Sequence, residues 1–156
     1  MQGIANGFFG FDIASRCATI WDDGEKKFTL TNEKQLGEAV VSVLKHPEIT
    51  ANKYLYISSV ETSQNEILAA LEKATSSKWT LHHTTTNEQV TEGSKKLQAG
   101  DFEGALQLVR AIPYGTFPGL DSNYAKDRVL ANGLLGLKEE SVQETIQRVV
   151  DKTKAN

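Results

Sequence analysis

The spacing of apolar residues predicts a helix between Thr31 and Pro47. Its apolar positions follow the i, i+3, i+4, i+7, i+8 rule of one helical face, and they are Leu36, Ala39, Val40, Val43 and Leu44. Thr31 or Asn32 supplies an N-cap. Pro47 cannot continue a helix, so we expect the helix to end before it.

Caps and breakers predict the remaining helices. Ser63 with Glu66, and Thr86 with Gln89, have the spacing of a capping box, and Asp101 is a third N-cap. The second of these helices should end at Gly100 and the third at Pro113. The tail from Asn123 to Lys154 is expected to form two helices broken near Gly133 to Gly136, the second of which buries apolar residues: Val142, Ile146 and Val149.

Alternating and β-branched segments predict the strands. Apolar and polar residues alternate from Cys17 to Leu30 about Asp23-Gly24, a dipeptide that favours a tight hairpin turn. Tyr54 to Val60 and Lys78 to Thr84 have the composition of two further strands. We therefore expect an α+β fold with a β-hairpin, two further strands and about five to six helices. The loop 114–122 is rich in Gly and Pro, and no linker divides residues 1–156, so we expect a single domain.

Composition excludes several classes of partner. The chain has 156 residues, a net charge of -3 and no basic stripe, so nucleic acid is not expected as a partner. Its apolar runs are too short for a membrane span, and no signal peptide is expected. The single cysteine, Cys17, rules out an internal disulfide and fits a reducing compartment, so we expect a cytoplasmic location.

Four segments together resemble the C-terminal part of fungal NmrA-like proteins, relatives of the isoflavone reductases in the atypical short-chain dehydrogenase group. The segments are Gly7-Phe8-Phe9-Gly10-Phe11-Asp12, Ala18-Thr19-Ile20-Trp21-Asp22-Asp23-Gly24, Lys53-Tyr54-Leu55-Tyr56-Ile57-Ser58-Ser59 and Gln64-Asn65-Glu66-Ile67-Leu68. The resemblance continues through Gly100-Asp101-Phe102 and covers nearly the whole chain. It implies the substrate lobe of such a protein, without the nucleotide-binding half that precedes it in the family.

The cofactor motif of the family has no match among these residues. A dinucleotide binds at a glycine-rich turn between a strand and a helix. Gly3, Gly7 and Gly10 are spaced G-x-x-x-G-x-x-G, follow no strand and precede no periodic helix. The family's catalytic lysine belongs to the other half. We therefore expect neither NAD(P) binding nor hydride transfer by this chain, and no cofactor-binding residue is assigned.

The resemblance also implies a strand whose edge is left unpaired. In the related reductases, the strand that corresponds to Tyr54 to Val60 lies beside the nucleotide-binding sheet. Without that sheet the strand would have unpaired backbone groups, which invite pairing with another chain. We expect a homodimer, or a partner chain that covers this edge.

Most candidates for catalysis have a simpler interpretation. His82 and His83 are adjacent in a predicted strand, so they point to opposite faces and cannot bind one metal ion together. No metal site is expected, although either imidazole is a candidate acid or base. Asp22 and Asp23 are explained by turn formation. Ser58 and Ser59 lack the G-x-S-x-G elbow of serine hydrolases, and Cys17 lacks a group that would activate its thiol.

The aromatic residues are the main candidates for ligand binding. By resemblance, the regions near Phe8 and near the Gly/Pro loop face the substrate, although the same rings could equally fill the core. The candidate substrate-binding residues are Phe8, Phe9, Phe11, Phe117, Tyr124 and Arg110. The candidate catalytic residues are Tyr114, Asp12, Asp121, His82 and His83.

Three functions follow from this assignment. The first is a stand-alone lobe that binds a small apolar or aromatic metabolite of secondary metabolism and isomerises or cyclises it without a cofactor. The second is a non-catalytic regulatory or binding module, and the third is half of an NAD(P)-dependent reductase that needs a partner chain. A closed aromatic cavity would favour the first, and an exposed edge favours the other two.

Overall fold

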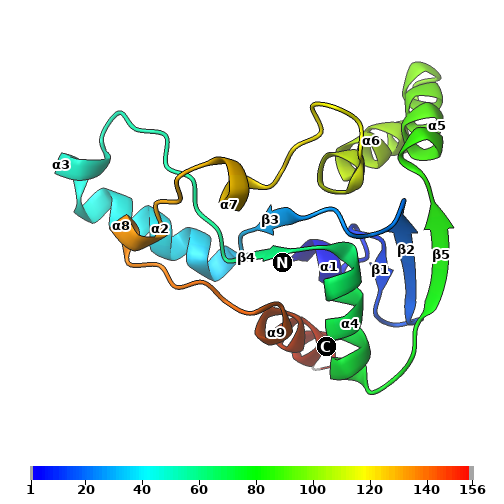
Figure 1. The fold of residues 1–156 in the computed structure, drawn as a ribbon, viewed down its shortest axis with the longest axis horizontal. Helices are drawn as coiled ribbons and strands as arrows, with labels where there is room; N and C mark the ends of the chain where they lie inside the picture. Colours follow the sequence, from blue (N-terminus) through cyan, green and yellow to red (C-terminus); the bar gives the residue numbers. More distant parts are fainter. Residues whose placement is uncertain (1, 155–156) are drawn as a thin grey trace.

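The structure, a computed structural model, describes residues 2–154 and has the expected α+β fold (Figure 1). Strands β1, β2 and β5 form one sheet, in the order β1-β2-β5, and β3 and β4 form a second. The strands are β1 (Phe11–Asp12), β2 (Cys17–Trp21), β3 (Phe28–Leu30), β4 (Val60–Thr62) and β5 (Thr80–Thr84). The helices are α1 (Gln2–Ala5), α2 (Glu33–Lys45), α3 (Pro47–Thr50), α4 (Gln64–Thr75), α5 (Thr86–Gln98), α6 (Glu103–Tyr114), α7 (Tyr124–Asp127), α8 (Asn132–Leu135) and α9 (Val142–Lys154).

The five long helices, α2, α4, α5, α6 and α9, are those that the sequence predicts. Ser63 and Glu66 form the expected capping box of α4. The box of α5 is formed by Thr85 and Glu88, one residue earlier than predicted, because the hydroxyl of Thr86 is used elsewhere. The tail differs from the prediction, since it contains two single-turn helices, α7 and α8, before α9. The left-handed Gly136 ends α8.

The expected hairpin from Cys17 to Leu30 does not form. A turn is present, since the amide of Gly24 donates to the carbonyl of Trp21 at 2.9 Å, but it separates strands of two different sheets. The reason is that β2 has no free edge: β1 pairs antiparallel to it and β5 pairs parallel to it. The side chain of Gln64 also bonds to the backbone of β2, at Trp21 N and Thr19 O. β3 pairs instead with β4.

The predicted strand from Tyr54 to Val60 is only partly formed. A single parallel bridge joins Tyr56 to Leu130, and regular pairing begins at Val60. Tyr54 itself is 96% exposed.

Apolar side chains gather in two cores of unequal size. The main core lies between the sheets, α4, α6 and α9, and its fully buried members include Phe11, Phe28 and Ile67. A small second core, built around Ala39, Ala131 and Leu135, lies beneath α2 at the left of Figure 1. On the opposite side, α5 and α6 pack closely through Gly93 and Gly104, where a side chain at either position would meet the facing backbone.

Candidate functional site

An aromatic cluster forms around Tyr114, at the end of α6. The Tyr114 ring lies 6.1 Å from that of Phe9, 6.0 Å from that of Trp21 and 5.3 Å from that of Phe28, measured between ring centroids. Its hydroxyl donates to the carbonyl of Phe9 at 3.0 Å. Burial raises the pKa of Tyr114, so its hydroxyl stays protonated at neutral pH. Tyr114 is therefore a hydrogen-bond donor inside the cluster and is only 3% exposed.

Arg110 and Phe8 form the outer layer of this cluster. The Arg110 guanidinium carbon lies 5.0 Å from the centroid of the Phe8 ring, and the Phe8 ring lies 5.3 Å from that of Phe9 in an edge-to-face arrangement. Arg110 Nε is buried and has no hydrogen-bond partner among the described residues. The nearest carboxylate is that of Glu103, 3.7 Å from an Arg110 terminal nitrogen. A cation with unused hydrogen-bonding capacity thus lies against a half-buried ring.

The other candidate aromatic residues lie outside this outer layer. Phe11 is fully buried in the main core, so it packs rather than lines a surface. Phe117 is exposed in the loop after α6, and Tyr124 lies against Tyr56 with their ring centroids 5.6 Å apart. The sequence-predicted set therefore splits, and only Phe8, Phe9 and Arg110 lie around Tyr114.

The acidic candidates stabilise local turns. Asp12 accepts hydrogen bonds from the amides of Ala14 and Ser15, and the bonds from Ser15 lower its pKa. Asp121 accepts from the amide of Asn123, which lowers its pKa in the same way. Both residues are exposed.

The two histidines lie on an edge strand. His82 and His83 are neighbours on β5 and both are exposed. β5 pairs with β2 on one side. Among residues 2–154 no group of three or more His, Cys, Asp or Glu side chains is placed to hold a metal ion.

A polar junction that the sequence analysis did not predict joins the end of β2 to α5. One carboxylate oxygen of Asp22 accepts from the amide of Thr86 at 2.9 Å, and the other accepts from the hydroxyls of Thr86 and Thr116. Burial opposes the ionisation of Asp22, but these hydrogen bonds outweigh it, and the pKa of Asp22 falls below its ordinary value. Asp22 therefore fixes the loop after α6, in addition to forming a turn.

Lys26 also binds the end of α6 and the loop that follows it. Its ammonium donates to the carbonyls of Ile112, Gly115 and Leu120. Burial lowers the pKa of Lys26, and the carboxylates of Asp121 and Asp22 act in the opposite direction. The end of α6, and with it Tyr114, is thus held by the half-buried ammonium of Lys26.

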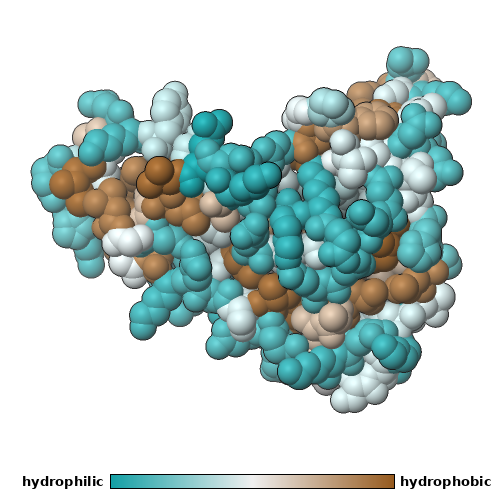
Figure 2. Space-filling model, viewed as in Figure 1, coloured by the Kyte–Doolittle hydropathy of each residue, from teal (hydrophilic) through white to brown (hydrophobic). Residues whose placement is uncertain are grey.

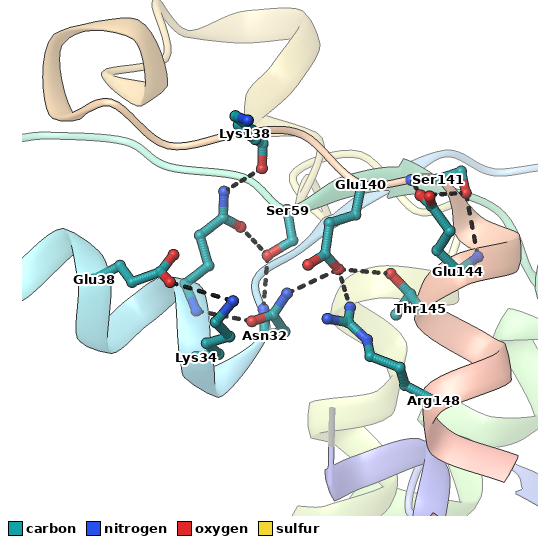
Figure 3. A network of polar contacts seen from close by, with 11 residues as sticks. Asn32, Lys34, Glu38, Ser59, Lys138, Glu140, Ser141, Glu144, Thr145 and Arg148 are labelled. Carbon is teal, nitrogen blue, oxygen red and sulfur yellow. Dashed lines mark hydrogen bonds and ion pairs between the residues drawn. The ribbon is translucent and has the colours of Figure 1, made fainter. Parts of the chain in front are cut away.

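A second polar network joins α2 to α9 (Figure 3). Glu140 accepts hydrogen bonds from Asn32 Nδ2 and Thr145 Oγ1, each at 3.0 Å, and forms an ion pair with Arg148. Burial opposes its ionisation, but the bonds from Arg148, Thr145 and Asn32 outweigh that effect and lower the pKa of Glu140. The network was not predicted, because no sequence motif connects its members.

This network forms one wall of an open cleft between α2 and α9. The cleft has a volume of about 1090 Å³. Its charged lining residues are balanced, with Lys34, Lys73, Lys138 and Arg148 against Glu38, Glu139, Glu140 and Glu144. No residue predicted for ligand binding lies in this cleft, and its charged lining does not suit an apolar ligand.

Two fungal oxidoreductases are similar to this chain in sequence. Oxidoreductase poxI of Penicillium oxalicum is 36% identical over 141 residues, which are 90% of this chain and 45% of that protein. Oxidoreductase aprR of Aspergillus flavus is 32% identical over 143 residues, which are 92% of this chain and 48% of that protein. The chain thus spans about half the length of the curated relatives it matches. No family model matches the chain.

A solved structure shares the fold. A nucleoside-diphosphate-sugar epimerase from Staphylococcus aureus superposes with a TM-score of 0.57 and 12% identity, over 94% of this chain and 48% of that one. The structural likeness shows that this chain shares the fold of about half of that epimerase. Among residues 2–154, no helix is both long enough and apolar enough to cross a membrane.

Proposed function

We propose that this chain is the substrate-binding lobe of an NmrA-like protein of the oxidoreductase type, and that it binds a small apolar or aromatic metabolite. The observation that carries the proposal is the 36% identity, over 141 residues, with part of a fungal oxidoreductase, in a chain that contains the aromatic cluster but no glycine-rich nucleotide turn. In this proposal, a separate nucleotide-binding part carries out the redox chemistry, and residues 1–156 do not provide that part.

The outer layer of the aromatic cluster is the proposed binding place. Phe8 offers a half-buried ring, and Arg110 beside it has a nitrogen without a partner. An aromatic ligand with a carboxylate or phenolate would stack on the ring and pair with the guanidinium. Such pairing would use the partly exposed terminal nitrogens of Arg110, one of which lies 3.7 Å from the carboxylate of Glu103.

Fluorescence of Trp21 tests this proposal, because Trp21 lies 6.0 Å from Tyr114 and adjoins the cluster. Titration with trans-cinnamate, an aromatic carboxylate, should change the emission saturably. The substitution Arg110→Met should weaken binding by about tenfold or more, since a charge-assisted hydrogen bond is lost.

A matched control is provided by Arg128, whose guanidinium lies 5.5 Å from the centroid of the Tyr56 ring, away from the cluster. Arg128→Met should leave cinnamate binding unchanged. Equal affinity in the wild type and Arg110→Met, or no saturable change at all, would reject the proposed place. NADPH should not bind to the chain alone.

A cofactor-independent isomerisation or cyclisation is the second candidate. Such a reaction needs an apolar contact surface and one proton donor, and the Tyr114 hydroxyl, which donates to the carbonyl of Phe9 at 3.0 Å, is the donor inside the cluster. Deuterium exchange into an aromatic ketone in D2O, followed by NMR, would detect the proton transfer. Exchange that Tyr114→Phe abolishes would support an enzyme, and ligand binding without exchange would indicate a binding module.

A further inference from the structure

Strand β5 forms an open edge of the three-stranded sheet. The order of that sheet is β1-β2-β5, β5 lies at the right of Figure 1, and among residues 2–154 no other strand pairs with its outer side. Four of its five residues are exposed, namely Thr80, Leu81, His82 and His83. Figure 2 shows hydrophilic and hydrophobic side chains mixed on this side of the molecule. The backbone of β5, rather than an apolar patch, is therefore the feature of this edge that a partner can bind.

The backbone groups that face outward belong to two residues of β5. The amide of Thr80 and the carbonyl of Thr84 each form a hydrogen bond of 2.9 Å with the residues that flank β2. In a parallel ladder every second residue directs its N–H and C=O groups toward the neighbouring strand, so residues 80, 82 and 84 face β2. Leu81 and His83 therefore direct their amides and carbonyls away from β2. Outside the ladder with β2, no hydrogen bond among residues 2–154 involves these four groups.

Antiparallel pairing of β5 with the β5 of a second copy would use all four of these groups. With a two-fold axis at His82, residue 81 of one protomer faces residue 83 of the other, and each such pair exchanges two hydrogen bonds. The same axis places Thr80 opposite Thr84 of the partner subunit, and cross-strand threonine pairs stabilise antiparallel strands. β5 contains no Asp, Glu, Lys or Arg, so an uncharged strand suits this edge, and β5 itself is such a strand.

The usual protection of an edge strand is absent from β5. Natural edge strands avoid pairing with other chains by carrying a proline, a lysine or another charged residue, or by forming a bulge. The segment Thr80–Thr84 has none of these residue types, and its register with β2 continues without a bulge from one end of the strand to the other. This edge is not the one that the sequence analysis expected at Tyr54 to Val60.

We infer that β5 is a self-association surface, on which a second copy of this chain adds its own β5 antiparallel to the first. The two sheets then join into one, with the strand order β1-β2-β5-β5-β2-β1. The contact needs no ligand and is independent of the proposed function. Two paired strands bury much less than the roughly 1,600 Å² of a standard interface, so the dimer is weak, with a dissociation constant on the order of 100 μM.

Sedimentation equilibrium over about 10 μM to 1 mM, a range that brackets this constant, tests the inference. The wild type should pass from monomer to dimer over that range. His82→Lys places two ammonium groups opposite each other at the axis, and His82→Glu does the same with two carboxylates. Each substitution alone should raise the dissociation constant roughly fivefold or more. An equimolar mixture of the two variants pairs an ammonium with a carboxylate and should dimerise at least as tightly as the wild type.

His46→Lys is the matched control, because His46 is also exposed and lies at the end of α2, on the opposite side of the molecule from β5 in Figure 1. It should leave the dissociation constant unchanged. Hydrogen exchange followed by NMR gives a second measurement. The amides of Leu81 and His83 should exchange severalfold more slowly at the highest concentration than at the lowest, whereas the amide of His82, which faces β2, should not respond.

Three results would overturn the inference. The first is a wild type that stays monomeric at the highest concentration. The second is dimerisation that His82→Lys leaves intact, since another surface would then form the contact. The third is a mixture of the Lys and Glu variants that associates no better than either variant alone, since residue 82 would then not face itself across the axis.

Discussion

Helices α2 and α9 have the same length and similar patterns, but the structure treats them differently. Each has 13 residues and an apolar stripe along one face. On α9, Ile146, Val149 and Val150 are buried against α4 and the main core. On α2, the stripe is exposed, and its residues are Leu36, Val40 and Leu44. Similar apolar patterns in the sequence therefore do not determine whether a helix face is buried within this chain.

The two helices are also held in different ways. α9 is held by apolar contacts, whereas the start of α2 is held by polar ones. Asn32 caps α2 and reaches Glu140, and the side chain of Gln35 donates to the carbonyl of Lys138 and accepts from the hydroxyl of Ser59. The network fixes the orientation of α2 while leaving its stripe open.

The largest expected effect comes from shortening a side chain on α9. Ile146→Ala removes a fully buried side chain and should lower the free energy of unfolding by about 2–5 kcal/mol. Val40→Ala, at a stripe position on α2, should change it by no more than about 0.5 kcal/mol. Urea unfolding of both variants checks the comparison, and similar losses would show that the exposed stripe is packed in solution.

An intermediate loss of stability is expected in the polar network that joins α2 to α9. Glu140→Gln replaces the carboxylate that binds Arg148 and should cost about 1–3 kcal/mol at pH 7. Because folding lowers the pKa of Glu140, its contribution is present above the ordinary value of 4.5 and is lost as the pH falls through the lowered pKa. The difference between wild type and Glu140→Gln should therefore shrink between pH 7 and pH 3. A difference that does not depend on pH would contradict this account.

A smaller loss of stability than at Glu140 is expected inside the aromatic cluster. Tyr114→Phe removes the hydroxyl that donates to Phe9 but keeps the ring, so the loss should be about 0.5–1.5 kcal/mol. Thermal unfolding measures it. A loss as large as that of Ile146→Ala would mean that the hydroxyl organises more of the core than one hydrogen bond.

Local features of the sequence predicted the helices well, because caps and breakers act within a few residues. No distant partner is needed for the capping box of Ser63 and Glu66, or for the end of α2 before Pro47. The hairpin prediction failed for the opposite reason. The alternation around Asp23-Gly24 is real, but one edge of β2 pairs with β1, which lies just before it in the chain, and the other pairs with the distant β5, which a local pattern cannot show.

The candidate site shows the same difference between what a sequence can and cannot predict. Of the larger set of candidate residues, the structure places four side by side, namely Phe8, Phe9, Arg110 and Tyr114, and the others lie elsewhere. Their roles in binding and catalysis stay predictions. The Glu140 network and the Asp22 junction were missed, since each assembles residues more than 60 positions apart without a shared motif.

The parallel pairing of β2 with β5 also has a kinetic consequence. Cys17 lies opposite Thr80, so the first rung of this ladder closes a loop of 80 − 17 = 63 residues. Such contacts form late, because the entropy of closing the loop is lost before the ladder stabilises it. The helices α4 and α5 need only local contacts and can form sooner. During folding, the edge of β2 that faces β5 would then stay unpaired until β5 arrives, although β1 can pair locally with its other edge. The speed of refolding would be set by that long-range closure.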